Sequence, residues 1–286
     1  MLTVHTIDEL RHWVGRWHRD ELRVALVPTM GALHEGHLRL IEAGLQEADR
    51  VVVSVFVNPA QFGEGEDFDA YPRVLEDDAA KLSARGAHLL FAPPVDAVYP
   101  GGVEQATYVE VPELSNMLCG AHRPGHFRGV ATVVAKLFNM VQPDVAVFGE
   151  KDFQQLAVIR RLTADLNFPV EIVGYPTVRE PDGVAMSSRN AYLTDEERAR
   201  APTLYQVLSD AAGELAEGAD PDGVAAEAHA RLEQAGFRPD YVSVRRAEDL
   251  APPQAGDTAL VVLAAAWLGR ARLIDNVTVA RVKPKP

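Results

Sequence analysis

Two histidines, His34 and His37, stand in a glycine-bearing segment whose residue types suit phosphate chemistry. The segment covers residues 28–37. It follows the apolar run 24–27, which is typical of a buried strand, and precedes leucines at helical spacing. A strand, a glycine turn and a helix N-terminus together form an anion site, because free backbone N–H groups and the helix dipole point at the bound group. Being three residues apart, both histidines project on the same side of the helix start, where they can donate hydrogen bonds to oxygens that gain charge.

The spacing of these residues excludes two other motifs. A P-loop is excluded because no Gly-Lys-Ser or Gly-Lys-Thr follows the glycines. The zinc-protease motif is excluded because it needs histidines four residues apart. An ordinary strand–helix connection stays open as the simplest alternative. The functional alternative is a His-x-Gly-His signature, of the kind found in nucleotidyltransferases and class I aminoacyl-tRNA synthetases.

A second candidate phosphate loop lies far downstream, at residues 184–190. Ser187, Ser188 and Arg189 supply two hydroxyls and a guanidinium, a suitable set for holding β- and γ-phosphates. Alone, this stretch would more often be a helix cap or a solvated loop. Together with the His-x-Gly-His segment, it resembles the Lys-Met-Ser-Lys-Ser loop of class I synthetases.

A third cluster lies between these two, where Gly149, Lys151 and Asp152 follow the apolar run 145–147. This places them at the carboxyl end of an expected strand, where open α/β sheets bind ligands. Lys151 can neutralise phosphate charge, and Asp152 can accept hydrogen bonds from ribose hydroxyls. A single cluster of this kind would be interpreted as a helix cap. Three of them favour a nucleotide site.

These motifs occur in the order found in the pantoate–β-alanine ligase (pantothenate synthetase) family, which the chain closely resembles. The matching segments are residues 28–37, 56–62, 71–73, 123–130, 149–155 and 186–190, with weaker matches at 240–242 and 274–276. Residues 243–246 depart from the family pattern, which is more acidic there.

The resemblance implies an ATP-dependent ligase that condenses (R)-pantoate with β-alanine through pantoyl adenylate. The products would be pantothenate, AMP and pyrophosphate, as a step in the biosynthesis of coenzyme A precursors. The implied co-substrate is ATP with Mg²⁺, and the implied assembly is a homodimer. The resemblance identifies no residues that bind Mg²⁺ or β-alanine.

The motifs and the resemblance together assign roles to individual residues. His34, His37 and Lys151 are the candidate catalytic residues. The resemblance alone implies that Gln61 and Gln155 would position pantoate. It also implies that Arg123 lies in the wall of the substrate cleft, where it would either meet a carboxylate or form a structural salt bridge. The expected ATP contacts are Met30, Gly31, His34, His37, Gly149, Lys151, Asp152, Val178, Met186, Ser187, Ser188 and Arg189.

Two groups of residues suggest metal binding, and both have a simpler explanation. Cys119, His122 and His126 have ligand-like spacing, but zinc would need a fourth ligand and Arg123 would oppose a cation. Asp77 and Asp78 are candidate Mg²⁺ contacts, although a carboxylate pair on a helix is usually solvated.

The composition excludes several classes of partner. The 286-residue chain has a formal net charge of −13, whereas phosphate backbones select basic surfaces, so we expect no nucleic-acid partner. No apolar run reaches the roughly 20 residues of a membrane helix, and we expect no signal peptide. With Cys119 as the only cysteine, an intramolecular disulfide is impossible. We therefore expect a cytoplasmic protein with small-molecule substrates and no membrane partner.

The alternation of strand and helix patterns predicts an α/β fold with a Rossmann-like, doubly wound parallel sheet over residues 1–175. Residues 176–286 are expected to form a smaller C-terminal α+β lid domain. Expected strands are 51–57, 88–91, 170–173, 241–244, 260–264 and 273–279, and expected helices are 75–84, 132–140, 195–215 and 224–234. Thr194 and Glu197 have capping-box spacing at the start of the third of these helices.

Two other function classes stay open at this point. A nucleotidylyltransferase would share the His-x-Gly-His turn but would join AMP to a phosphate acceptor. A non-catalytic nucleotide-binding module would share the site without the reaction. Neither alternative predicts release of AMP that depends on β-alanine.

Overall fold

The computed structural model describes residues 1–281, which divide into two compact units. Unit 1 comprises residues 1–150 and 158–176, and unit 2 comprises residues 151–157 and the chain from residue 177 onward. Lys151, Asp152 and Gln155, expected from sequence in the first domain, therefore group with unit 2. One physical reason is a bond from Asn276 Nδ2 to the Lys151 carbonyl, at 3.0 Å.

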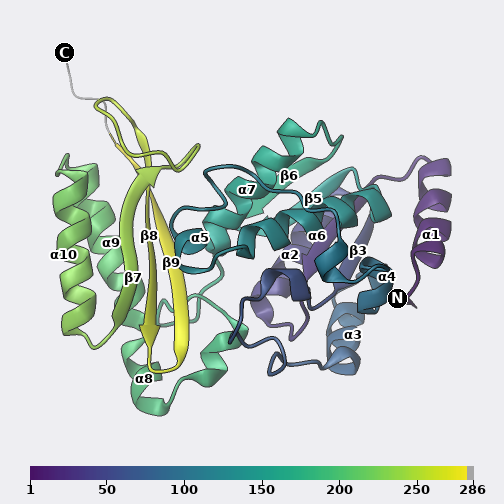
Figure 1. Ribbon diagram of the computed structural model, residues 1–286, viewed down its shortest axis with the longest axis horizontal. Coiled ribbons are helices and arrows are strands. Elements are labelled where there is room, and N and C mark those ends of the chain that lie inside the picture. The colour runs from purple at the N-terminus through teal and green to yellow at the C-terminus, as the bar shows by residue number, and fades with distance from the viewer. Residues whose placement is uncertain (282–286) are drawn as a thin grey trace. The chain divides into compact units, whose positions relative to one another are not determined.

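Unit 1 is built on a six-stranded parallel sheet with the strand order β1-β4-β3-β2-β5-β6. Strands β3, β5 and β6 of this sheet are labelled in Figure 1. The strands are β1 Leu2–Val4, β2 Val24–Thr29, β3 Arg50–Val55, β4 Leu89–Phe91, β5 Val145–Gly149 and β6 Glu171–Tyr175. Long apolar, β-branched runs such as β3 are typical of parallel strands that are covered on both faces. The predicted parallel α/β sheet is confirmed.

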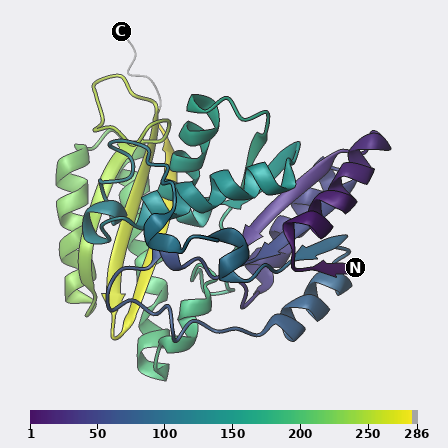
Figure 2. The ribbon, with the colours of Figure 1, turned by 45° about the vertical axis from the view of Figure 1, so that its right-hand side comes forward.

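Helices cover both faces of this sheet (Figure 2). Ala25 and Val27 of β2 pack in one apolar core with Ile41 of α2 and Leu82 of α3. The helices and 3-10 turns of this part of the chain are α1 Ile7–Arg19, α2 Glu35–Glu47, η1 Pro59–Gln61, α3 Leu75–Ala84, α4 Val95–Val98, η2 Val103–Gln105, α5 Cys119–His122, α6 His126–Val141, η3 Glu150–Asp152 and α7 Phe153–Asp165. Neither β1 nor α1 was predicted from sequence, although Thr6 and Glu9 form a capping box at the start of α1.

The strand order creates a switch point between β2 and β5. From β2 the chain proceeds through β3 to β4 on one side, whereas β5 and β6 lie on the other side. Ligands of open α/β sheets bind outside the carboxyl ends of the strands at such a point. The turn at Met30 and Gly31 follows β2 directly, and Glu150 follows β5. The topology thus makes this edge of unit 1 its expected ligand-binding edge.

Unit 2 contains a three-stranded antiparallel sheet, β7-β8-β9, with helices packed against it. The sheet's core includes Leu208 and Leu232 from two of these helices and Val262 from the central strand. The elements are η4 Ser188–Tyr192, α8 Asp195–Arg200, α9 Pro202–Ala216, α10 Pro221–Gln234, β7 Arg238–Arg246, β8 Ala259–Leu268 and β9 Ala271–Ala280. The predicted smaller α+β part is confirmed.

The prediction of one helix over residues 195–215 is wrong. The chain forms two helices, α8 and α9, because Pro202 lacks the N–H of a continuing helix and starts α9 instead. The predicted capping box is present. Thr194 Oγ1 accepts a bond from the Glu197 N–H at 3.3 Å, and Glu197 Oε2 accepts one from the Thr194 N–H at 2.8 Å.

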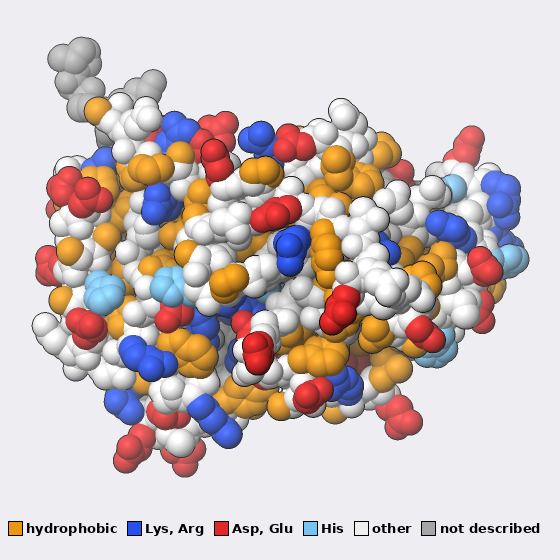
Figure 3. All heavy atoms as spheres, viewed as in Figure 1, with side chains coloured by type: hydrophobic (Ala, Val, Ile, Leu, Met, Phe, Trp, Pro, Cys, Tyr) orange, Lys and Arg blue, Asp and Glu red, His pale blue; other side chains and the backbone are white. Residues whose placement is uncertain are grey.

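The surface shows charges of both signs. On the face drawn in Figure 3, Lys and Arg side chains are interspersed with Asp and Glu side chains. Such mixing differs from the basic stripe that tracks a nucleic-acid backbone. Within residues 1–281, each helix is too short or too polar to cross a membrane.

Candidate active site

The two motif histidines lie together at the start of α2. His34 is the N-cap residue, His37 follows in the first turn, and their ring centroids are 4.1 Å apart. The backbone N–H of His34 donates to Nδ1 of His37 at 3.4 Å. A neutral His37 therefore carries its proton on Nε2, which leaves that atom as a donor. The geometry agrees with the side-by-side placement predicted from the spacing.

The turn before α2 has an unusual backbone that the surrounding structure holds in place. Gly31 has φ +85°, and Ala32 has φ +51°, a value that L residues adopt rarely. Both oxygens of the buried Asp78 carboxylate accept backbone bonds here, from Ala32 N at 2.9 Å and Leu33 N at 2.7 Å. Asp78 thus anchors the turn, in place of the Mg²⁺ contact considered from sequence, and Asp77 pairs with Lys81 at 2.7 Å.

Replacement of Asp78 tests this anchoring role. We expect Asp78→Asn to lower the free energy of unfolding by about 1–3 kcal/mol, because one buried backbone N–H loses its acceptor. The neighbouring Asp77→Asn removes only an exposed ion pair and should cost roughly 0–0.5 kcal/mol. Urea unfolding of both variants measures the difference, and equal losses would contradict the anchor.

Gln61 ends η1 with its side chain fixed by a chain of hydrogen bonds in unit 1. The Tyr99 hydroxyl donates to Asn58 Oδ1 at 2.8 Å, and Asn58 Nδ2 donates to Gln61 Oε1 at 3.0 Å. Gln61 Nε2 lies 3.2 Å from the sulfur of Met30, so these two predicted contacts are brought together. Because its oxygen accepts from Asn58 and one amide N–H donates to the Met30 sulfur, Gln61 offers its other amide N–H as a donor.

Asn58 and Tyr99, which hold the Gln61 side chain, were not identified from sequence as its partners. Asn58 lies in the matched segment 56–62, so its place there was the available signal. Tyr99 carried no local signal, because its partner is 41 residues away. Burial raises the pKa of Tyr99 above its ordinary value, and repulsion from Tyr108 raises it further by a smaller amount. The hydroxyl consequently keeps the proton that it donates to Asn58.

Arg123 forms a salt bridge in the structure. Its guanidinium donates two bonds to Glu66, at 2.7 and 2.6 Å, and its third nitrogen lies 3.0 Å from His126 Nε2. Burial raises the pKa of Glu66, but hydrogen bonding and attraction from Arg123 more than offset this, so the pKa lies below its ordinary value. His126 Nδ1 in turn donates to the Gln61 carbonyl at 2.8 Å. A contact between Arg123 and a substrate carboxylate stays a prediction.

The spacing of Cys119, His122 and His126 does not correspond to a metal site in the structure. Cys119 is buried at the start of α5, whereas the His126 ring lies between Arg123 and Gln61. Over residues 1–281, no group of three or more His, Cys, Asp or Glu side chains has the arrangement needed to hold a metal ion.

The downstream loop of unit 2 is held at its base by backbone pairing. Met186 N donates to Val178 O at 3.0 Å, and Arg179 forms an antiparallel bridge with Ala185. Ser187 then caps η4, accepting a bond from Arg189 N at 3.3 Å. Ser187 therefore has the helix-capping role that the simpler interpretation of this stretch predicts. Hydroxyl lone pairs allow Ser187 to cap and to face a ligand as well.

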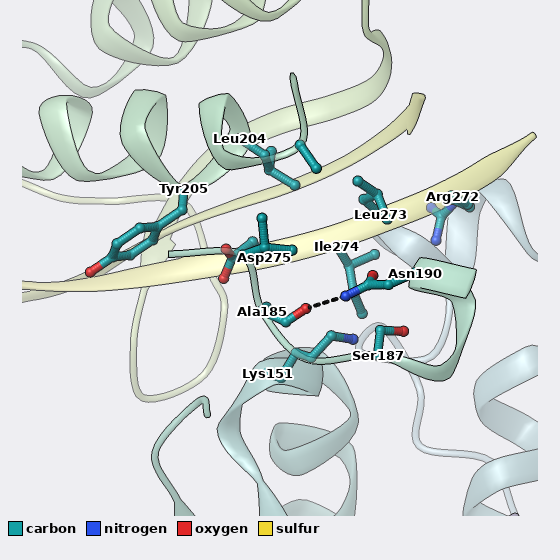
Figure 4. Close-up of a pocket in the computed structure, with 12 residues that line it drawn as sticks. Lys151, Ala185, Ser187, Asn190, Leu204, Tyr205, Arg272, Leu273, Ile274 and Asp275 are labelled. Atoms are coloured by element: carbon teal, nitrogen blue, oxygen red, sulfur yellow. Dashed lines mark hydrogen bonds between the residues drawn. The ribbon is translucent and has the colours of Figure 1, made fainter. Parts of the chain in front are cut away.

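Lys151 and Ser187 line the same pocket in unit 2 (Figure 4). The Lys151 ammonium lies 3.8 Å from the Asp152 carboxylate. The pocket residues are Lys151, Val184, Ala185, Ser187, Asn190, Ala201, Leu204, Tyr205, Arg272, Leu273, Ile274 and Asp275. Two of the three sequence clusters thus contribute to one cavity. Gln155 lies in the first turn of α7 and is half-buried.

Comparison with known proteins identifies the family. The sequence model of the family "Pantoate-beta-alanine ligase" matches residues 2–278. The chain belongs to the pantoate–β-alanine ligase family. Pantothenate synthetase from Alkalilimnicola ehrlichii is 59% identical over 270 residues, which are 94% of each chain. The protein of that name from Shewanella amazonensis is 57% identical over 98% of this chain and 100% of its own.

Solved structures of this family agree with the fold. Pantothenate synthetase from Thermus thermophilus superposes with a TM-score of 0.89 at 48% identity, over 97% of this chain and 99% of its own. The ligase from Francisella tularensis, solved with β-γ ATP and β-alanine, gives a TM-score of 0.82 at 32% identity over 97% of each chain. The family resemblance, the α/β fold and the assignment as an acid–amine ligase are thereby confirmed.

Proposed function

We propose that this ligase condenses (R)-pantoate with β-alanine at the expense of ATP, through a pantoyl-adenylate intermediate. The observation that carries the proposal is the His34–His37 pair at the carboxyl end of β2, at the switch point of the sheet. The Francisella ligase, complexed with β-γ ATP and β-alanine, supports both as substrates here.

In the first half-reaction, a pantoate carboxylate oxygen attacks the α-phosphorus of ATP, and the bond to the bridging oxygen of pyrophosphate breaks. The carboxylate is ionised at neutral pH, so the step needs no strong general base. Catalysis then depends on alignment and charge stabilisation. In unit 1, His34 and His37 would donate to phosphate oxygens as charge develops. In unit 2, Lys151 would neutralise the α-phosphate and the leaving pyrophosphate.

Other residues would bind the nucleotide. Ser187, Ser188 and Arg189 in unit 2 would hold the β- and γ-phosphates, and Asp152 would accept hydrogen bonds from ribose. Gly31 and Gly149 in unit 1 would let the backbone approach the nucleotide closely. The side chains proposed to pack near the adenosine are Met30 in unit 1 and Val178 and Met186 in unit 2.

Mg²⁺ is proposed to arrive bound to the ATP phosphates, whose charge it neutralises. The donor set agrees with this role, because both Asp78 oxygens hold the backbone turn and no carboxylate cage exists among residues 1–281. Mg²⁺ is commonly held mainly by substrate phosphates and water, with one or two protein groups. No step above depends on a metal held by the protein alone.

In the second half-reaction, the β-alanine amine attacks the acyl carbon of the adenylate. The carbon–oxygen bond to AMP breaks, an amide forms and the amine loses a proton. Gln61 and Gln155 would position pantoate, with Gln61 donating through its other amide N–H. Arg123 would line the wall of the substrate site, where it would meet a carboxylate only by leaving its salt bridge with Glu66.

One assay distinguishes this function from the two alternatives. AMP formation is measured with ATP, pantoate and β-alanine, each omitted in turn. We expect AMP release to require all three. AMP transfer to a phosphate acceptor would indicate a nucleotidylyltransferase, and nucleotide binding without turnover would indicate a binding module.

Replacement of Gln61 should weaken the use of pantoate selectively. We expect Gln61→Ala to raise the KM for pantoate roughly tenfold or more, because a fixed hydrogen-bond donor is lost. The KM for ATP should change far less. Gln105→Ala is the matched control, since Gln105 also ends a 3-10 turn but is exposed. Equal losses for both substrates in initial-rate kinetics would exclude the assignment.

Three further assignments stay predictions. Residues 176–286 are proposed to act as a lid domain, the assembly is proposed to be a homodimer, and the protein is proposed to be cytoplasmic. Sedimentation of the purified protein would test the dimer directly.

A further inference from the structure

Strand β9 carries two adjacent polar residues in the interior of unit 2, Asp275 and Asn276. Their exposed fractions are only 4% and 7%. They pair across the sheet with Ala264 and Leu263 of β8, at positions where apolar side chains are usual. Buried polar groups are retained with hydrogen-bond partners, so these partners indicate what the two residues do.

Asn276 holds the backbone of the turn that contains Lys151. Its side-chain Nδ2 donates to the Lys151 carbonyl at 3.0 Å, across 125 residues of sequence. This bond restrains the backbone from which the Lys151 side chain extends into the pocket (Figure 4).

Asp275 holds the loop that leads to Ser187, and it does so through Arg179. The Arg179 guanidinium donates to both Asp275 oxygens, at 2.7 and 2.9 Å, and also to Gly183 O at 3.0 Å. The guanidinium also donates to the Asn276 carbonyl at 3.4 Å, and its carbon lies 3.6 Å from the centroid of the Tyr205 ring. Such a two-pronged pair fixes orientation as well as distance. The base of the loop is thereby joined to β9.

We infer that Asp275 and Asn276 form a positioning pair, which sets the spacing between the Lys151 turn and the Ser187 loop. The inference rests on the proposed function, in which these two segments bind the phosphates of ATP. Adjacent residues on one strand are a fixed distance apart, so a strand that holds both segments also fixes their separation. Neither Asp275 nor Asn276 touches ATP in this role. They act through Lys151 and Arg179.

The simpler alternative is that both residues serve only the stability of the sheet. A buried ion pair is often no more stabilising than an apolar core. Kinetic effects that are specific to ATP therefore distinguish a positioning role from a purely structural one. Positioning predicts a lower kcat/KM for ATP with the KM for pantoate unchanged, whereas a stability role predicts a lower melting temperature and normal kinetics of the folded enzyme.

Steady-state kinetics of Asn276→Ala test the role on the Lys151 side. We expect kcat/KM for ATP to fall by roughly ten- to a hundredfold, because small displacements of a catalytic group are costly. The KM for pantoate should stay within about twofold, since Gln61 lies in unit 1 and the Asn276 bond reaches the Lys151 carbonyl rather than the Gln155 side chain. Unchanged kcat/KM for ATP in the folded variant would overturn the inference.

A double-mutant cycle then shows whether Asn276 acts through Lys151. If it does, adding Asn276→Ala to Lys151→Ala causes little further loss, because the group being positioned is already absent. Additive losses would mean that Asn276 acts independently of Lys151, against the inference. A second cycle, which combines Asp275→Asn with Ser187→Ala, tests in the same way whether Asp275 acts through the Ser187 loop.

The control variant is Asp249→Asn, which removes a two-pronged Arg–carboxylate pair with Arg246, the last residue of β7. It should leave kcat/KM for ATP unchanged. If Asp275→Asn does not fold, Asn276→Ala decides alone, since it removes a neutral amide and leaves the buried Arg179–Asp275 ion pair in place. A wild-type enzyme that forms no AMP would reject the proposed function and the inference with it. An active wild type with normal Asn276→Ala kinetics would reject the inference only.

Discussion

His37→Ala is expected to lower the turnover number by roughly a hundredfold or more, as does the loss of a preorganised donor to developing charge. His34→Ala should have an effect of the same order, because the two rings lie 4.1 Å apart at the same helix start. The folded state should persist in both variants, since both side chains are only half-buried. Single-turnover measurement of pyrophosphate release reports the first half-reaction directly.

The tautomer of His37 indicates which ring nitrogen would act as the donor. Nδ1 of His37 accepts a bond from His34 N, so the catalytic donor would be Nε2–H. A glutamine amide can place an N–H donor in a similar position, so His37→Gln should retain more activity than His37→Ala. His12→Ala, on the exposed face of α1, is the matched control. Near-wild-type turnover in His37→Ala would make the histidine structural and our assignment wrong.

Gly129→Ala is expected to have the second large effect, on both folding and pantoate use. A Cβ at this position of α6 would lie 2.1 Å from Ala60 O and 2.7 Å from Gln61 Cα. Both neighbours are backbone atoms, so the chain at η1 itself would have to shift, taking the side chain of Gln61 with it. Overpacking usually lowers the free energy of unfolding by about 1–3 kcal/mol. Because the added Cβ would meet backbone atoms, we expect the loss for Gly129→Ala to reach or exceed the upper limit of this range.

Chemical denaturation and pantoate kinetics together check the Gly129 prediction. Gly213→Ala is the control, because a Cβ there meets nothing within 4 Å and the residue lies inside α9. That replacement should stabilise the protein by about 0.5–1 kcal/mol, through the higher helix propensity of alanine. A Gly129→Ala protein with normal stability and a normal KM for pantoate would contradict the close packing of α6 on η1.

Local features of the chain could be predicted from sequence because neighbouring residues produce them. The strand–turn–helix around His34 and His37, the capping box of Thr194 and Glu197, and the alternation that builds a parallel sheet all depend on residues a few positions apart. The division of α8 from α9 was also encoded locally, by Pro202, but the strong helical pattern around it concealed the break.

The partners of the site residues were decided by the tertiary structure. Asp78 anchors a turn 45 residues away, Tyr99 orients Asn58 from 41 residues away, and Asn276 holds the Lys151 carbonyl from 125 residues away. Local periodicity does not predict such hydrogen bonds, because they form only when the packed core brings distant segments together. The sequence by itself therefore determined which residue types are available for phosphate chemistry and on which elements they lie. Only the folded units decided which of those side chains are held in place, and by what, because hydrogen bonds between distant segments depend on packing rather than on spacing along the chain.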